Sequence, residues 1–111
     1  MLDLIKRVAL SAGAVLALGA IFLSSPAVAQ DGKALFAAKI CNTCHGPTGN
    51  APILSTYPKL AGQNADYLIA QLKAFKTQER KSGQAALMWG MAAQLSDQEM
   101  VAVSKWLQSQ K

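Results

Sequence analysis

Cys41, Cys44 and His45 form a cluster whose residue types and spacing could do chemistry. They are the only two cysteines and the only histidine among 111 residues, and they lie within five positions. On a helical turn, cysteines three residues apart share one face, and His45 follows one turn after Cys41. The Cys-x-x-Cys-His pattern is that of covalent c-type haem attachment, in which both thiols bind the porphyrin and the imidazole binds its iron.

The same residues could instead form a structural disulfide, a thioredoxin-like redox pair or half of a zinc site. Zinc needs four ligands, and this short motif supplies three. A redox pair of the thioredoxin kind lies in a βαβ pattern, which the sequence does not show. Covalent attachment of one haem c, with its iron, is therefore the interpretation that fits the cluster.

Residues 1–29 have the pattern of an export signal peptide. A basic start at Lys6 and Arg7 precedes a run of 16 apolar and small residues, and Ala27-Val28-Ala29 fits the small-x-small cleavage pattern. We expect cleavage and a periplasmic location, with residues 30–111 forming a single monohaem domain. An uncleaved membrane anchor is the alternative, although a spanning helix needs about 20 apolar residues.

The expected mature chain carries nine basic and five acidic residues, a net charge of +4. The basic residues are scattered and lack the clustered stripe with interleaved aromatic residues that nucleic-acid binding requires, which excludes that class of partner. An acidic surface on a partner protein is the natural complement of this charge. The candidates for contacting such a surface are Lys39, Lys59, Lys73 and Lys76.

Apolar spacing and helix start signals predict an all-α domain, with three main helices and loops wrapped around one covalently attached haem. Asp31 is a capping residue for the first helix, and Ser96 with Glu99 forms a capping box before the last. Residues 46–63 and 77–86 are rich in polar residues, Gly or Pro and predict loops. The helices are expected at residues 32–40, 64–76 and 97–109.

Iron held by His45 has a sixth position, whose occupant decides between electron transfer and ligand binding. A methionine thioether favours ferrous iron and raises the reduction potential. Met100 falls on the apolar face of the last helix, where core packing explains it better. Met88 and Met91 lie in a stretch expected to be a loop across the far side of the haem, and one of them is the expected ligand.

With these features the chain resembles the class I c-type cytochromes. Within them it is similar to a single domain of the dihaem cytochromes of the c-four kind and to other small bacterial monohaem carriers. The likeness extends over the expected mature chain. It rests on Gly32 and Phe36, on Cys41-Asn42-Thr43-Cys44-His45, on Pro58 to Gln63 and Tyr67 to Leu72, and on Met88 to Met91 with Leu95-Ser96-Asp97 behind them.

The resemblance implies roles for two residues near the iron. The family proline that matches Pro58 turns its carbonyl toward the ring N–H of the proximal histidine, here His45, which strengthens donation to iron. The family's methionine ligand corresponds to Met88, with Met91 as the runner-up.

The resemblance also implies the cytochrome c fold itself. Gly32 and Phe36 would cross the aromatic residue of the last helix, here Trp106, with the glycine permitting close approach. The chain has one haem motif, so transfer between two haems inside it is not expected.

When protein groups occupy both axial positions, substrate does not reach iron, so the chain is not expected to be an enzyme. The favoured function is a one-electron carrier between respiratory or photosynthetic redox partners, with membrane complexes among the candidate donors and acceptors, through small transient interfaces. One alternative is the electron-accepting subunit of a periplasmic dehydrogenase complex. Another is a haem protein whose labile sixth position binds small ligands.

A mass measurement tests this interpretation directly. Protein matured in a host that attaches haem c is expected to weigh as much as residues 30–111 plus one haem. A colourless protein with the mass of the bare polypeptide would contradict covalent attachment. The mass of the full chain plus one haem would contradict only the cleavage of the signal.

Overall fold

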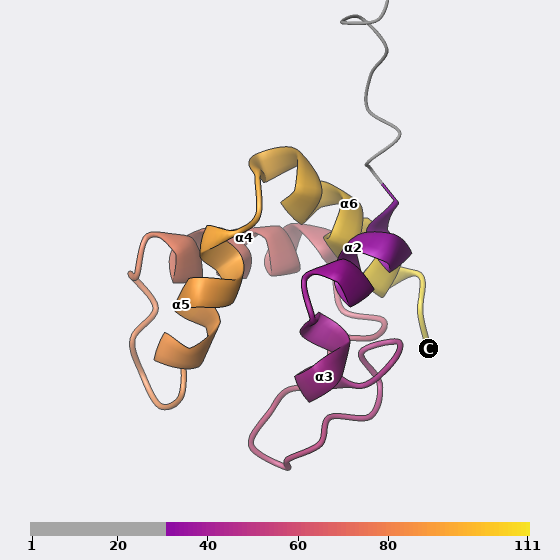
Figure 1. The fold of residues 1–111 in the computed structure, drawn as a ribbon, viewed down its shortest axis with the longest axis horizontal. Helices are drawn as coiled ribbons and strands as arrows, with labels where there is room; N and C mark the ends of the chain where they lie inside the picture. The colour runs from indigo at the N-terminus through magenta and orange to yellow at the C-terminus, as the bar shows by residue number, and fades with distance from the viewer. Residues whose placement is uncertain (1–30) are drawn as a thin grey trace, which may run out of the picture.

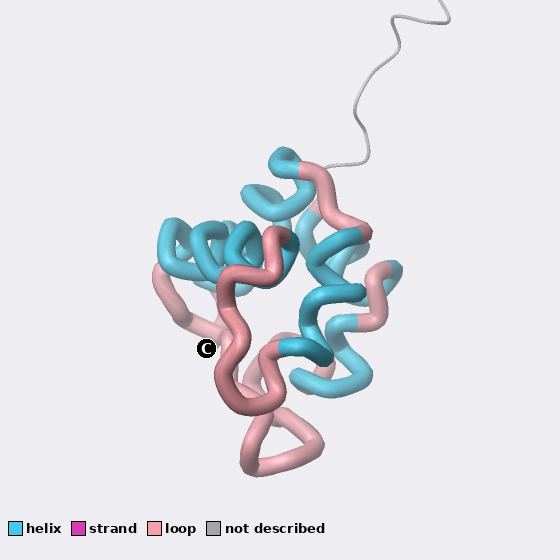
Figure 2. Tube along the Cα trace, turned by 90° about the vertical axis from the view of Figure 1, so that its left-hand side faces the viewer, coloured by secondary structure: helices cyan, strands magenta, loops and turns pink. Residues whose placement is uncertain are grey.

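Residues 31–111 are the part of the chain that the computed structural model describes, and they form five helices joined by loops (Figure 1). No strand occurs within this range (Figure 2), which confirms the all-α prediction. The expected signal, residues 1–29, lies outside it. No helix in the described range is both long and apolar enough to span a membrane. The helices are α2 (Gly32–Ala38), α3 (Cys41–His45), α4 (Ala65–Lys76), α5 (Ala86–Ala93) and α6 (Asp97–Gln108).

The helix starts follow the capping residues of the sequence. The Asp31 carboxylate accepts a hydrogen bond of 3.0 Å from the backbone N–H of Lys33 and begins α2. Both bonds of the capping box before α6 are present, because Ser96 Oγ accepts from the Glu99 N–H at 3.1 Å and Glu99 Oε1 accepts from the Ser96 N–H at 3.0 Å. These contacts satisfy backbone donors that the helix itself leaves unpaired, and the three predicted helices are confirmed.

The first predicted helix ends earlier than expected. Helix α2 stops at Ala38 rather than at Ile40, because Ile40 adopts a left-handed backbone conformation with φ of 56°. This conformation is rare for a β-branched residue and costs about 1–3 kcal/mol, so the surrounding fold must impose it. The turn lets the chain start a separate helix, α3, which carries the whole Cys-x-x-Cys-His motif.

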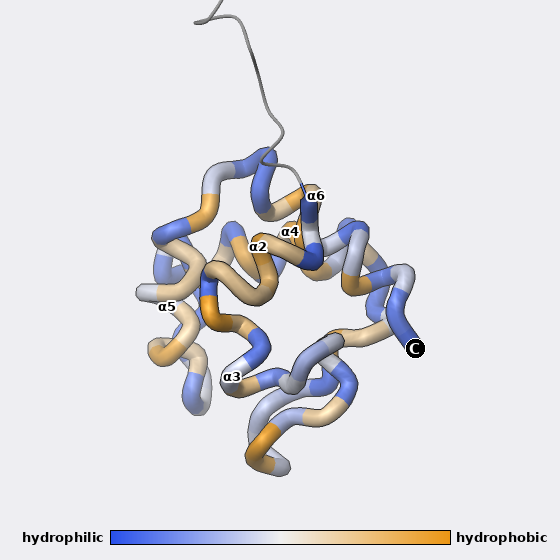
Figure 3. Tube along the Cα trace, turned by 45° about the vertical axis from the view of Figure 1, so that its right-hand side comes forward, coloured by the Kyte–Doolittle hydropathy of each residue, from blue (hydrophilic) through white to orange (hydrophobic). Residues whose placement is uncertain are grey.

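The expected loop around Met88 and Met91 is wrong, because residues 86–93 form helix α5. Most of its residues are alanine, leucine or methionine, which favour helix strongly. No side chain caps its N-terminus, and the segment is hydrophobic on every side (pale to deep orange for most of α5 in Figure 3). The segment therefore shows neither the start signal nor the apolar stripe from which helices are predicted.

Helices α2 and α6 cross in close contact. A Cβ atom added to Gly32 would lie 2.6 Å from Trp106 Cβ and would also collide with the carbonyl oxygen of Ala102. Beside this crossing, the rings of Phe36 and Trp106 have centroids 5.1 Å apart and are tilted by 47°. The backbone approach therefore depends on the missing side chain at position 32.

Replacing Gly32 with alanine is expected to lower the free energy of unfolding by about 1–3 kcal/mol, since the new methyl group overpacks a contact with backbone. Gly90→Ala is the matched control, because a Cβ at this helical position meets no atom within 4 Å. That variant is expected to gain about 0.5–1 kcal/mol. Denaturant unfolding of the haem-loaded proteins measures both, and equal stability of the two variants would contradict the packing argument.

Candidate haem site

A mostly apolar cavity of about 480 Å³ lies among α3, the segment 46–64, α4, α5 and α6. This volume falls in the range of about 300–1,000 Å³ that is typical of cofactor sites. The segment after α3 forms a long loop that leads to α4 (pink in Figure 2). The apolar wall of the cavity includes Phe36, Leu60, Leu68, Leu72, Phe75 and Val103.

His45 stands at the end of α3 with only 6% of its surface exposed. Its ring nitrogen Nδ1 lies 2.9 Å from the carbonyl oxygen of Pro58. A carbonyl only accepts hydrogen bonds, so Nδ1 carries the proton in this contact and donates it. The lone pair of Nε2 is then free to bind a metal, in the tautomer that a backbone carbonyl normally fixes.

Cys41 and Cys44 are half-buried free thiols, and both line the same cavity as His45. Burial raises the pKa of the Cys41 thiol, and the neighbouring Cys44 adds a smaller increase against the lowering effect of a backbone hydrogen bond. Within residues 31–111, no group of three or more His, Cys, Asp and Glu side chains could hold a metal ion. In the same range the two thiols are not joined in a disulfide.

Helix α5 supplies both candidate methionines. Met88 and Met91 are three residues apart, half-buried, and both line the cavity. Met100 is fully buried and does not line it, so its predicted role in core packing is confirmed. Met88 also packs against a small core cluster formed by Phe75, Ala85 and Ala92.

The other predicted residues divide between the cavity and the helix crossing. Pro58 and Phe36 line the cavity together with the haem motif, whereas Gly32 and Trp106 do not and lie where α2 meets α6. Trp106 contacts the wall of the site through the Phe36 ring and the core cluster to which that ring belongs.

Among residues 31–111, two cationic side chains line the cavity, and no Asp or Glu does. They are Lys59 and Arg80. The Arg80 guanidinium stacks 4.6 Å from the centre of the Phe75 ring and donates a 2.9 Å hydrogen bond to Gln71 Oε1. No role was predicted for Arg80, because no local pattern in the sequence indicates that a residue after α4 turns toward the cavity. These cations favour a cofactor with anionic groups, such as the carboxylates of haem.

The sequence model of the family Cytochrome c matches residues 29–111. Cytochrome c4 of Thiocapsa roseopersicina is 38% identical over 93 residues, which cover 77% of this chain and 48% of the relative. Cytochrome c-554(548) of Halomonas halodenitrificans is 44% identical over 73 residues, covering 64% of this chain and 84% of the relative. The thiosulfate dehydrogenase electron acceptor of Thiomonas intermedia is 39% identical over 70 residues, covering 63% of this chain and 32% of the relative.

These matches define a haem protein of the class I type, similar to one domain of the c4 cytochromes. The chain belongs to the cytochrome c family. It spans about half the length of the cytochrome c4 relatives that it matches. The resemblance inferred from the motif and its surroundings is thus confirmed.

The cofactor of this family is covalent haem c, and the donor set of the site fits one such group. Two thiols and one buried imidazole project from a single short helix into an apolar cavity with cationic side chains on its wall. When bound, the haem supplies a one-electron iron couple.

The hydrogen bond between His45 and Pro58 can be tested by proton exchange. In the reduced protein, the Nδ1 proton of His45 is expected to exchange with solvent at least tenfold more slowly than the indole N–H of Trp89. The reason is that His45 is buried, whereas the Trp89 hydrogen bond to the Arg80 carbonyl, at 2.9 Å, is exposed. NMR exchange measurements give both rates, and faster exchange at His45 would contradict the assignment.

Proposed function

We propose that this chain is a periplasmic one-electron carrier whose haem c is attached through Cys41 and Cys44 and ligated by His45 and Met88. The observation that carries the proposal is that the buried histidine and the methionine-bearing helix α5 line one apolar cavity. Protein groups from two separate elements can therefore occupy both axial positions. A site closed in this way exchanges electrons and leaves no position for a substrate.

Each axial side chain contributes differently to the reduction potential. The Pro58 carbonyl polarises the ring of His45 through Nδ1 and makes Nε2 a stronger donor. The thioether of Met88 is a soft ligand that favours the ferrous state and raises the potential. Because both groups are packed against protein, little has to move when the oxidation state changes, which suits rapid outer-sphere transfer.

The choice of Met88 over Met91 rests on two arguments. Met88 matches the ligand position in the family pattern, and it packs against Phe75, Ala85 and Ala92, which fixes its side of α5. Met91 lines the cavity as well and is the runner-up. Its simplest role is that of an apolar wall residue that fills space beside the ligand.

The partners are redox proteins with acidic surfaces, met in transient contacts. Lys73 is an exposed candidate for such contacts, and Lys59 lies at the cavity wall. A dedicated electron-accepting role for a periplasmic dehydrogenase is the second candidate function, supported by the similarity to thiosulfate dehydrogenase electron acceptors. Copurification with a larger catalytic chain would favour this second role, and fast oxidation of the free chain by several partners would favour the first.

Substitution of the two methionines tests the ligand assignment. The oxidised wild-type protein is expected to show the far-red sulfur-to-iron absorption band, which Met88→Ala abolishes and Met91→Ala retains. Loss of the band only in Met91→Ala would transfer the ligand role to Met91. Absence of the band from the wild-type protein, together with carbon monoxide binding by the reduced form, would instead support an open sixth position.

A further inference from the structure

Helix α5 is attached to the rest of the fold mainly through its contact with α4. It packs chiefly on α4, whereas α6 packs on both α2 and α4. Gly90 in the middle of α5 has no neighbour within 4 Å of where its Cβ would be. The helix that carries both candidate methionines therefore depends mainly on its packing against α4 to hold its place beside the cavity.

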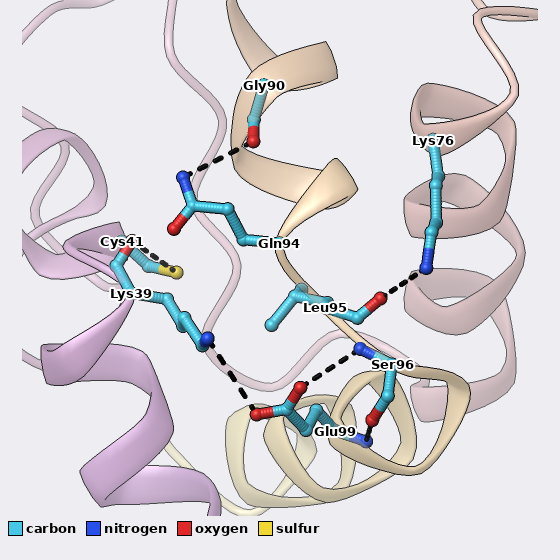
Figure 4. A network of polar contacts seen from close by, with 8 residues as sticks. All are labelled: Lys39, Cys41, Lys76, Gly90, Gln94, Leu95, Ser96 and Glu99. Atoms are coloured by element: carbon cyan, nitrogen blue, oxygen red, sulfur yellow. Dashed lines mark hydrogen bonds and ion pairs between the residues drawn. The ribbon is translucent and has the colours of Figure 1, made fainter.

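A set of polar contacts meets at the short link between α5 and α6 (Figure 4). The ammonium group of Lys76, at the end of α4, donates a 2.6 Å hydrogen bond to the carbonyl oxygen of Leu95. On the other side of this link, the Glu99 carboxylate accepts from the Ser96 N–H and lies 4.0 Å from Lys39 Nζ. Residues from α4, α6 and the end of α2 thus converge on one turn of chain.

The contact made by Lys76 is the strongest candidate among these for fixing α5. An ion pair as long and solvated as that of Lys39 with Glu99 contributes little to stability. A charged donor on a carbonyl is stronger, and Leu95 O lies just beyond the C-terminus of α5, where a cation is favoured by the helix dipole. Leu95 is 4% exposed and its side chain lines the cavity, so the tether reaches the wall of the site.

The carboxylate of Glu99 is the negatively charged group at this link. Its pKa lies below the ordinary value, mainly because the Ser96 backbone N–H donates to it, with smaller contributions from Lys39 and Lys76. In the middle of α5, the indole N–H of Trp89 donates to the Arg80 carbonyl at 2.9 Å. The Trp89 contact thus involves the residue next to Met88, and the Lys76 contact lies just after the end of the helix.

We propose that Lys76 is a positioning residue, which holds α5 against α4 through the Leu95 carbonyl and thereby keeps the methionine ligand within reach of the iron. This inference rests on the proposed histidine and methionine ligation. Loss of the tether frees the C-terminal end of α5, so an external ligand competes more easily for the sixth position.

Three variants of the haem-loaded protein test this role. Lys76→Met removes the donor and keeps a long side chain, Lys76→Arg keeps a donor, and Lys73→Met removes an exposed lysine one turn earlier on α4. Imidazole binding to the oxidised protein is followed by loss of the far-red sulfur-to-iron band. Lys76→Met is expected to bind imidazole about tenfold more tightly than wild type, since a charged hydrogen bond is lost. Lys76→Arg and Lys73→Met are expected to stay within about twofold of wild type.

The outcomes separate this proposal from the proposed function. Wild-type protein without the sulfur-to-iron band would overturn the methionine ligation and this inference with it. Wild-type protein with the band, but with the imidazole affinity unchanged in Lys76→Met or raised equally in Lys73→Met, would overturn the positioning role alone.

If Lys76→Met does not mature into a haem-loaded protein, a measurement on the wild-type protein tests the proposal instead. NMR of the lysine ammonium groups is expected to show slowed proton exchange at Lys76 relative to Lys73. Equal exchange at the two groups would overturn the proposal.

Discussion

The fold is arranged around one apolar cavity, which both of its hydrophobic clusters border. The buried hydrophobic residues form two clusters, one centred on Phe36 and the other on Phe75, and both of these rings line the cavity of about 480 Å³. Leu72 packs against both clusters and also faces the cavity. A small domain buries little apolar surface, so a bound flat apolar cofactor completes the core where the two clusters meet. A haem bound in this cavity would therefore contact both clusters.

The two walls of the cavity that carry the candidate iron ligands differ in how firmly they are built. His45 lies on the same short helix as both cysteines, and its ring is held by the Pro58 carbonyl in a buried position. The turn at Ile40 fixes the direction of that helix. On the other wall, α5 follows 40 residues later and packs chiefly on α4. The position of His45 relative to the cysteines is thus set by neighbouring residues in the chain, whereas the position of the methionines is set by tertiary contacts.

This difference also explains what the sequence could predict. Capping at Asp31 and Ser96 involves neighbours in the chain, so α2 and α6 could be located without a structure. Helix α5 has no capping side chain and no apolar stripe, and its helical state is favoured by its alanines and its packing on α4, which no periodicity reveals. The Lys76 contact with Leu95 joins residues 19 apart, and only their spatial arrangement shows it.

The helical state of α5 changes the question of which methionine binds iron. In a loop, Met88 and Met91 could point in different directions, whereas three residues apart on a helix they share a face and both reach the cavity. Residue type therefore does not decide which methionine binds iron. The position of α5 along α4 decides it. If α5 slid along its own axis by the rise of one residue, each sulfur would move by about 1.5 Å, which is large compared with the tolerance of a metal–ligand bond. The hydrogen bonds at Trp89 and, beyond the helix end, at Leu95 are therefore the contacts that we expect to set this position.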